Sequence, residues 1–149
     1  MTADERFMHA AICLAKIAQG RAHPNPIVGA VIVKNRKIIG KGYHKRYGLP
    51  HAEINAIKDA GKSAKGGVLY VTLEPCDHFG HTPPCTAAII RSGIRKVVIG
   101  MKDPNPINNG RGILKLTDNG IAAVVGVLED EAKSINAPYI KYIRALRHR

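Results

Sequence analysis

The alternation of helical and extended patterns constrains the fold of these 149 residues more than any other feature of the sequence. Short runs rich in β-branched residues predict strands, because such side chains pack well on a pleated surface. Between them, apolar residues recur every three or four positions, which is the period of an amphipathic helix. The expected strands span 27–33, 37–43, 68–72, 96–100 and 121–125, and the expected helices span 3–18, 52–60, 85–92, 113–118 and a last segment from residue 129. Without a long linker or an internal repeat, residues 1–149 are expected to form a single α/β layered domain.

Local signals add detail to this pattern. Thr2 and Glu5 have the spacing of a capping box, which starts a helix. Lys34-Asn35-Arg36 lies between two predicted strands and is expected to turn a hairpin. Pro138 falls inside the last helical segment, where we expect it to break or kink the helix.

Composition excludes several classes of protein. The chain is 45% hydrophobic and 23% charged, which favours a globular fold over a disordered or coiled-coil chain. No apolar run approaches the roughly 18 residues that a membrane-spanning helix needs, and the acidic N-terminus is unlike a secretory signal. Three cysteines are too few for a disulfide scaffold and fit a reducing compartment. We therefore expect a cytoplasmic protein with no membrane partner.

The formal net charge of +12 suits an anionic partner, either a nucleic acid or a phosphorylated small molecule. A solvated basic surface would explain the same charge. Aromatic residues, which single-strand binders use as stacking platforms between basic groups, make up only 5% of the chain. The charge therefore favours a phosphate-bearing partner only weakly, and nucleic acid is not expected.

Three potential metal ligands fall where a strand or loop meets a predicted helix: His51, Cys76 and Cys85. One imidazole and two thiolates suit zinc, and three ligands leave the open position of a catalytic site. Glu53 follows two residues after His51, and a carboxylate beside a zinc-activated water can move a proton to a leaving amine. Buried structural thiols are one alternative. A structural zinc is another, and it would need a fourth ligand, for which His78 and His81 are the candidates.

These residues carry a resemblance to a known superfamily. His51-Ala52-Glu53 followed by Pro75-Cys76 matches the signature of zinc-dependent base deaminases. Most branches place the second cysteine three residues after the first, whereas Cys85 follows Cys76 by nine. Residues 72–85 are similar to the deaminase domain of the bifunctional pyrimidine deaminase/reductase of riboflavin biosynthesis. Further similar segments are 23–29, 42–44, 103–106 and 110–112, and the resemblance extends from about residue 5 to 143.

The resemblance implies a cytidine-deaminase-like fold, a three-layer α/β/α sandwich around a five-stranded mixed sheet. It also implies hydrolytic deamination of 2,5-diamino-6-ribosylamino-4(3H)-pyrimidinone 5′-phosphate to the corresponding 5-amino-uracil derivative and ammonia, an early step of riboflavin biosynthesis. In this interpretation His51, Cys76 and Cys85 bind Zn²⁺, the only expected cofactor, and Glu53 transfers protons.

The same resemblance implies that Asn25, His44, Asp103 and Asn105 line the substrate pocket. Asparagine and aspartate are also common in turns, and His44 could be a polar strand end, so a structural role stays open for each. Family members usually carry lysine or arginine where this chain has His81. We expect His81 to contact the substrate phosphate, because the loop between the two cysteines offers little apolar bulk for packing. The alternative is that His81 closes the loop or faces solvent.

The family's usual reductase half is missing from residues 1–149, which we therefore expect to be a free-standing deaminase. The resemblance implies a phosphorylated pyrimidine as small-molecule partner and a homo-oligomer, and it leaves open whether a separate reductase docks. A tRNA-type or nucleoside deaminase would share the metal site, but the tRNA branch has two residues between its cysteines. A non-catalytic subunit with this fold is disfavoured because every residue needed for the chemistry is present.

Overall fold

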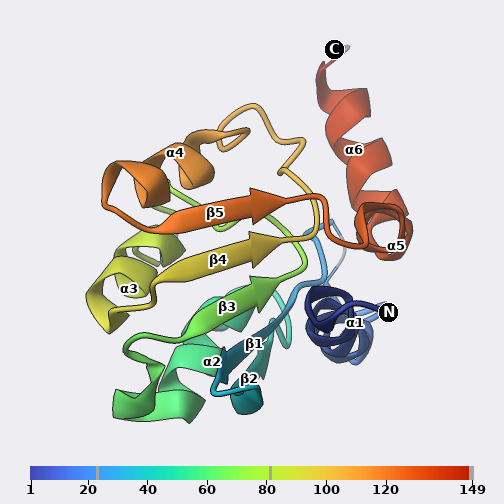
Figure 1. Cartoon of the computed structure of the whole chain (residues 1–149). Helices are drawn as coiled ribbons and strands as arrows, with labels where there is room; N and C mark the ends of the chain where they lie inside the picture. The colour runs from blue at the N-terminus through green and yellow to red at the C-terminus, as the bar shows by residue number, and fades with distance from the viewer. Residues whose placement is uncertain (23, 81, 148–149) are drawn as a thin grey trace.

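The computed structural model describes residues 1–22, 24–80 and 82–147 and contains one five-stranded mixed sheet with the strand order β2-β1-β3-β4-β5 (Figure 1). β1 is antiparallel to both β2 and β3, whereas β3, β4 and β5 run parallel. The strands are β1 (Gly29–Lys34), β2 (Lys37–Tyr43), β3 (Val68–Val71), β4 (Lys96–Ile99) and β5 (Ala122–Val125). The expected five-stranded mixed sheet is confirmed.

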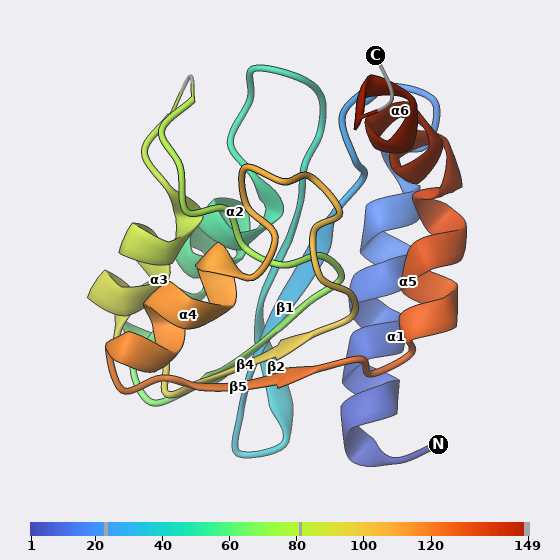
Figure 2. The same cartoon turned by 90° about the horizontal axis from the view of Figure 1, so that it is seen from above.

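Helices cover both faces of this sheet. α1 and α5 lie side by side on one face, and α2, α3 and α4 lie on the other (Figure 2). The helices are α1 (Ala3–Lys16), α2 (Ala52–Ala60), α3 (Cys85–Ser92), α4 (Arg111–Asp118), α5 (Glu129–Ile135) and α6 (Ala137–Arg147), with a 3₁₀ turn η1 (Gly61–Ala64). The three-layer α/β/α arrangement expected from the resemblance is therefore present.

Two of the predicted local signals form as expected. The side chain of Thr2 accepts a hydrogen bond from the backbone N–H of Glu5, and the Glu5 side chain accepts one from Thr2 N, which completes the capping box of α1. Asn35 and Arg36 both have positive φ, 52° and 64°, which is the backbone of a tight hairpin turn between β1 and β2.

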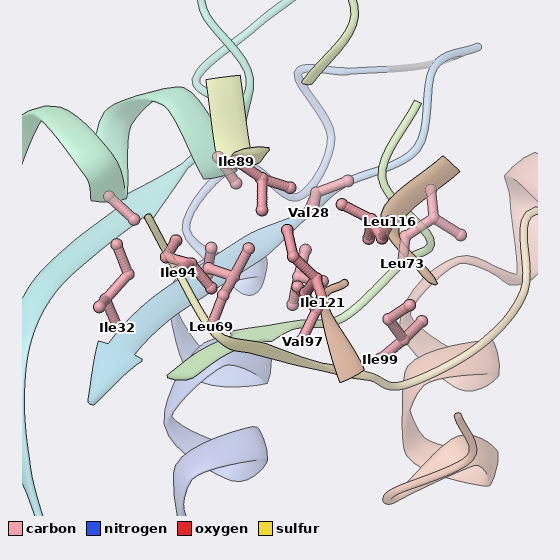
Figure 3. Close-up of a cluster of buried hydrophobic side chains, with 14 of the residues drawn as sticks. Val28, Ile32, Leu69, Leu73, Ile89, Ile94, Val97, Ile99, Leu116 and Ile121 are labelled. Carbon is pink, nitrogen blue, oxygen red and sulfur yellow. The ribbon is translucent and has the colours of Figure 1, made fainter. Parts of the chain in front are cut away.

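Each face of the sheet has its own apolar core. Val31, Tyr70 and Val98 point toward α1, while the alternate residues of the same strands point toward α2, α3 and α4. Gly29 permits close packing of β1 on α1, since a Cβ there would lie 1.9 Å from the carbonyl oxygen of Ala11. Figure 3 shows the larger core, whose labelled side chains are Val28, Ile32, Leu69, Leu73, Ile89, Ile94, Val97, Ile99, Leu116 and Ile121.

The C-terminal helical segment breaks at a different residue from the one predicted. α5 ends at Ile135 and α6 begins at Ala137, so the break lies at Asn136 and Pro138 occupies the first turn of α6. A proline is tolerated there because the first N–H groups of a helix have no intrahelical acceptor. Among the described residues, none of the helices has the length and apolar character that a membrane crossing requires.

Candidate active site

Three ligand-type side chains converge where β3 ends and two helices begin. His51 is the N-cap of α2, Cys85 is the first residue of α3, and Cys76 lies in the segment after β3. Their ligand atoms all lie within 4.8 Å of one another. His51 Nδ1 is 3.2 Å from Cys85 Sγ and 3.8 Å from Cys76 Sγ, and Cys85 N donates to Cys76 Sγ at 3.3 Å. The fold thus brings together the three residues that the sequence proposed as metal ligands.

The donor set fits zinc. Cys85 is buried, and His51 and Cys76 are half-buried. Hydrogen bonding from the Cys85 thiol lowers the pKa of Cys76, and the same hydrogen bond, together with burial, raises the pKa of Cys85. One thiolate is therefore favoured even in the bare protein, and thiolate is the form that binds metal. Within the described part of the chain the group has no fourth member. His78 lies outside the group, and His81 lies outside the described residues.

Glu53 sits in the first turn of α2 with its side chain almost fully buried, at 4% exposure. Burial, followed by the nearby Cys76, raises the pKa of Glu53 to about 7. A carboxyl group whose pKa lies near neutrality can both accept and return a proton. Glu53 lines the same cavity as His51 and Cys76.

That cavity has a volume of about 370 Å³ and collects most of the other predicted site residues. Asn25, His44, Asp103 and Asn105 all line it, from three loops that are distant in sequence. His81 falls outside the described residues, although its neighbours Gly80 and Thr82 lie on the lining.

His44 is placed in the cavity as a buried group with an uncommitted nitrogen. Its side chain is 6% exposed, and its Nε2 atom has no hydrogen-bond partner within the described structure. The ring meets that of His51 edge-on, with centroids 5.0 Å apart. Burial lowers the pKa of His44, which favours the neutral ring. A bound molecule could satisfy the unpartnered nitrogen.

Asp103 and Asn105 combine turn geometry with a place on the cavity. Asn105 N donates to Asp103 Oδ1 at 3.0 Å, and Ile107 N donates to Asn105 Oδ1 at 3.1 Å. These are the local bonds of the turn interpretation. Burial raises the pKa of Asp103, while hydrogen bonds from Asn105, Tyr139 and Asn108 oppose that shift.

Glu74 ties the Asp103 loop to the metal-binding segment, a role that sequence reasoning missed. Its buried carboxylate accepts backbone N–H groups from Asp103, Gly110 and Ile113, each at 3.1 Å. Asn108 adds two more links, since its Nδ2 donates to Pro75 O and its Oδ1 accepts from Asp77 N. These bonds cross more than 28 residues of sequence, so no local pattern reports them.

Helix α6 provides a wall of the cavity that the sequence analysis also missed. Tyr139, Tyr142, Ile143 and Leu146 line the cavity, and they recur at the spacing of one helix face. That spacing was a usable signal for a helix face. It gave no indication that this helix face would line a cavity together with the metal-ligand residues, which lie more than 50 residues earlier in the chain.

Comparison with known proteins places this site in a family. Residues 1–101 match the family described as cytidine and deoxycytidylate deaminase zinc-binding region. The diaminohydroxyphosphoribosylamino-pyrimidine deaminase of Buchnera aphidicola (subsp. Schizaphis graminum) is 50% identical over 95% of this chain and 96% of its own. The riboflavin biosynthesis protein RibD of Aquifex aeolicus is 56% identical over 94% of this chain and 39% of its own, so the chain spans about two-fifths of that longer relative.

A solved structure has the same fold. The diaminohydroxyphosphoribosylaminopyrimidine deaminase/5-amino-6-(5-phosphoribosylamino)uracil reductase of Thermotoga maritima superposes with a TM-score of 0.92 at 50% identity. The match covers 97% of this chain and 42% of that protein. Fold, ligand set and sequence agree, and the chain belongs to the cytidine and deoxycytidylate deaminase zinc-binding family.

Proposed function

We propose that this protein hydrolyses the exocyclic amine of 2,5-diamino-6-ribosylamino-4(3H)-pyrimidinone 5′-phosphate, releasing ammonia and the corresponding 5-amino-6-ribosylamino-uracil phosphate. The observation that carries the proposal is the His51, Cys76 and Cys85 cluster, two of whose members, His51 and Cys76, line one cavity with the buried carboxyl group of Glu53. The substrate class is supported by the names of relatives that are about 50% identical over nearly the whole chain.

In this proposal His51, Cys76 and Cys85 hold Zn²⁺, which when bound supplies Lewis-acid chemistry by lowering the pKa of water toward neutrality. Glu53 takes a proton from the attacking water, whose oxygen forms a bond to the ring carbon that bears the amine. The carboxyl group of Glu53 passes this proton to the adjacent ring nitrogen, and it then transfers the second proton, from the new hydroxyl group, to the amine nitrogen. The carbon–nitrogen bond breaks, ammonia leaves, and the ring keeps the water oxygen as a carbonyl. Burial of Glu53 supports this role, because it raises the pKa to about 7.

We further propose that Asn25, His44, Asp103 and Asn105 hold the pyrimidine and its ribosyl group, and that His81 meets the phosphate. The cavity of about 370 Å³ lies within the size range of small-molecule sites. The unpartnered Nε2 of His44 supports a direct contact, since a buried polar atom is costly without a hydrogen bond.

Residues 1–149 are proposed to act as one deaminase unit that assembles as a homo-oligomer in the cytoplasm, where its thiols stay reduced. The name of the Thermotoga relative pairs this deaminase with a uracil reductase, which supports a reductase, covalently attached or separate, as the next enzyme to use the product.

The test is ammonia release from the phosphorylated diaminopyrimidine, measured beside cytidine, deoxycytidylate and tRNA, together with elemental analysis of the purified protein. We expect one zinc per chain and ammonia from the diaminopyrimidine. Ammonia from cytidine, deoxycytidylate or tRNA but not from the diaminopyrimidine would assign the protein to another branch of the family.

A further inference from the structure

Helix α6 is attached to the rest of the site by a buried side-chain hydrogen bond. The Tyr139 hydroxyl donates to Asp103 Oδ1 at 2.8 Å, and both side chains are 7% exposed. Both residues line the cavity. Through this bond the tyrosine contacts one of the residues proposed to bind substrate.

The bond from Tyr139 differs from the other bonds to the Asp103 carboxylate. Asn105 N donates to Oδ1 at 3.0 Å, and Asn108 Nδ2 approaches Oδ2 at 3.5 Å, but both belong to the same loop as Asp103. Among the described residues, Tyr139 alone donates to this carboxylate from outside the Asp103 loop. It therefore fixes the orientation of the carboxylate relative to the body of the protein.

The base of α6 is held by a second, independent contact. Asn136 Oδ1 accepts Ile27 N and Asn136 Nδ2 donates to Ile27 O, both at 2.8 Å. Ile27 lies two residues after Asn25, in a loop that also contributes to the cavity lining. One turn of helix separates Asn136 from Tyr139, so α6 holds the Asn25 loop and the Asp103 loop at a fixed separation.

From these contacts we propose that Tyr139 is a positioning residue that latches α6 to Asp103 and thereby sets the affinity for the pyrimidine substrate. The latch rests on the proposed function, because it acts on a residue proposed to bind that substrate. Tyr139 and Asp103 both lie beyond the residues 1–101 that match the family, so the latch belongs to the part of the chain outside that shared region. It acts on binding by shaping the cavity, while the proton transfer stays with Glu53.

The test compares Tyr139→Phe with a matched control, Tyr70→Phe. Tyr70 also donates a hydroxyl hydrogen bond to an aspartate, Asp4 Oδ1 at 2.5 Å, but it packs against Phe7 in the α1 core, away from the cavity. Steady-state ammonia release gives KM and kcat, calorimetry gives the Kd of the deaminated product, and thermal unfolding reports on folding. Asp103→Asn and the double variant Asp103→Asn/Tyr139→Phe complete a double-mutant cycle, which measures the coupling between the two residues.

We expect Tyr139→Phe to raise KM and the product Kd about tenfold, the effect of losing one hydrogen bond to a charged group, while kcat changes less than twofold. Tyr70→Phe should leave KM, kcat and product Kd unchanged. If Tyr139 acts through Asp103, adding Tyr139→Phe to Asp103→Asn should change KM and Kd less than twofold further.

The latch would be overturned if Tyr139→Phe bound product as tightly as the wild type, or if its effect multiplied fully with that of Asp103→Asn. An equal loss of affinity in Tyr70→Phe would also overturn it, because the effect would then follow from weakened folding. A wild-type protein that binds the pyrimidine without releasing ammonia would refute the proposed function instead, and the Kd comparison would still decide the latch.

Discussion

Replacing Glu74 with glutamine tests whether three backbone hydrogen bonds to one buried carboxylate hold the Asp103 loop against the metal-binding segment. Glu74 Oε1 accepts from Asp103 N and Gly110 N, and Oε2 accepts from Ile113 N. Glutamine is nearly isosteric and keeps one acceptor oxygen. Its NH₂ group must then face a backbone N–H, so at least one hydrogen bond is replaced by a contact between two donors.

The structure gives the expected size of the effect. A hydrogen bond to a charged group contributes about 1.5–3 kcal/mol, and a domain of this size loses roughly 2–4 °C of Tm per kcal/mol, so the fall in Tm is on the order of 3–12 °C. Little relaxation is available around Glu74, because a Cβ on Gly112 would already lie 2.0 Å from Pro75 O. The loosened loop carries Asp103, so KM should rise as well.

Thermal and urea unfolding of Glu74→Gln, beside Glu131→Gln as a matched control, would measure this. Glu131→Gln is the same chemical change at an exposed position of α5, where its effect on the free energy of unfolding should stay within about 0.5 kcal/mol. A Glu74→Gln protein whose Tm equals that of Glu131→Gln would refute the reasoning. The loop would then be held by Asn108 and packing alone.

Three further predictions concern the site. Cys76→Ser should lose zinc by elemental analysis and lower the Tm, because the metal joins α2, α3 and the segment after β3. Cys13→Ser, at an exposed position of α1, should keep its zinc. Glu53→Gln should keep zinc and fold, but its rate of ammonia release should fall by a factor of about 10²–10⁴. A fall of less than tenfold would show that Glu53 does not transfer the proton. Burial raises the pKa of Asp103 above its ordinary value of 3.8, so the folded state favours the protonated group and loses stability as the pH rises through the folded pKa. Asp103→Asn lacks this loss. As the pH is raised from 4 to 7, the free energy of unfolding in urea should therefore rise for Asp103→Asn relative to the wild type, and the opposite trend would contradict a raised pKa for Asp103.

The sheet and its hairpin could be predicted from sequence because their signals are local. The β-branched runs gave strand positions to within about two residues, and the signal is strongest in β1, β3 and β4, whose side chains are buried on both faces of the sheet. The turn at Asn35 and Arg36 is also local, because two strands separated by so few residues have one short connection available.

Features that depend on tertiary hydrogen bonds could not be predicted in this way. The break before α6 falls at Asn136 because its side chain pairs with the backbone of Ile27, which is 109 residues away in sequence. Pro138, the local signal, predicted a break two residues too late. Glu74 presented a similar difficulty, since a carboxylate in the middle of a motif gives no sign that it accepts N–H groups from a distant loop.

The candidate site likewise contains residues that could be predicted from local spacing and residues that could not. His51, Glu53, Cys76 and Cys85 could be proposed because metal chemistry restricts residue type and spacing. Asp103 and Asn105 were left between a turn role and a substrate role, and the structure explains why the sequence could not separate the two. The turn uses Asp103 Oδ1, which accepts from Asn105 N and from Tyr139, while Oδ2 has a contact of 3.5 Å from Asn108. One carboxylate can therefore order its own loop through one oxygen and offer the other to a ligand. The turn bonds strengthen the substrate proposal, because they fix the direction in which that second oxygen is presented.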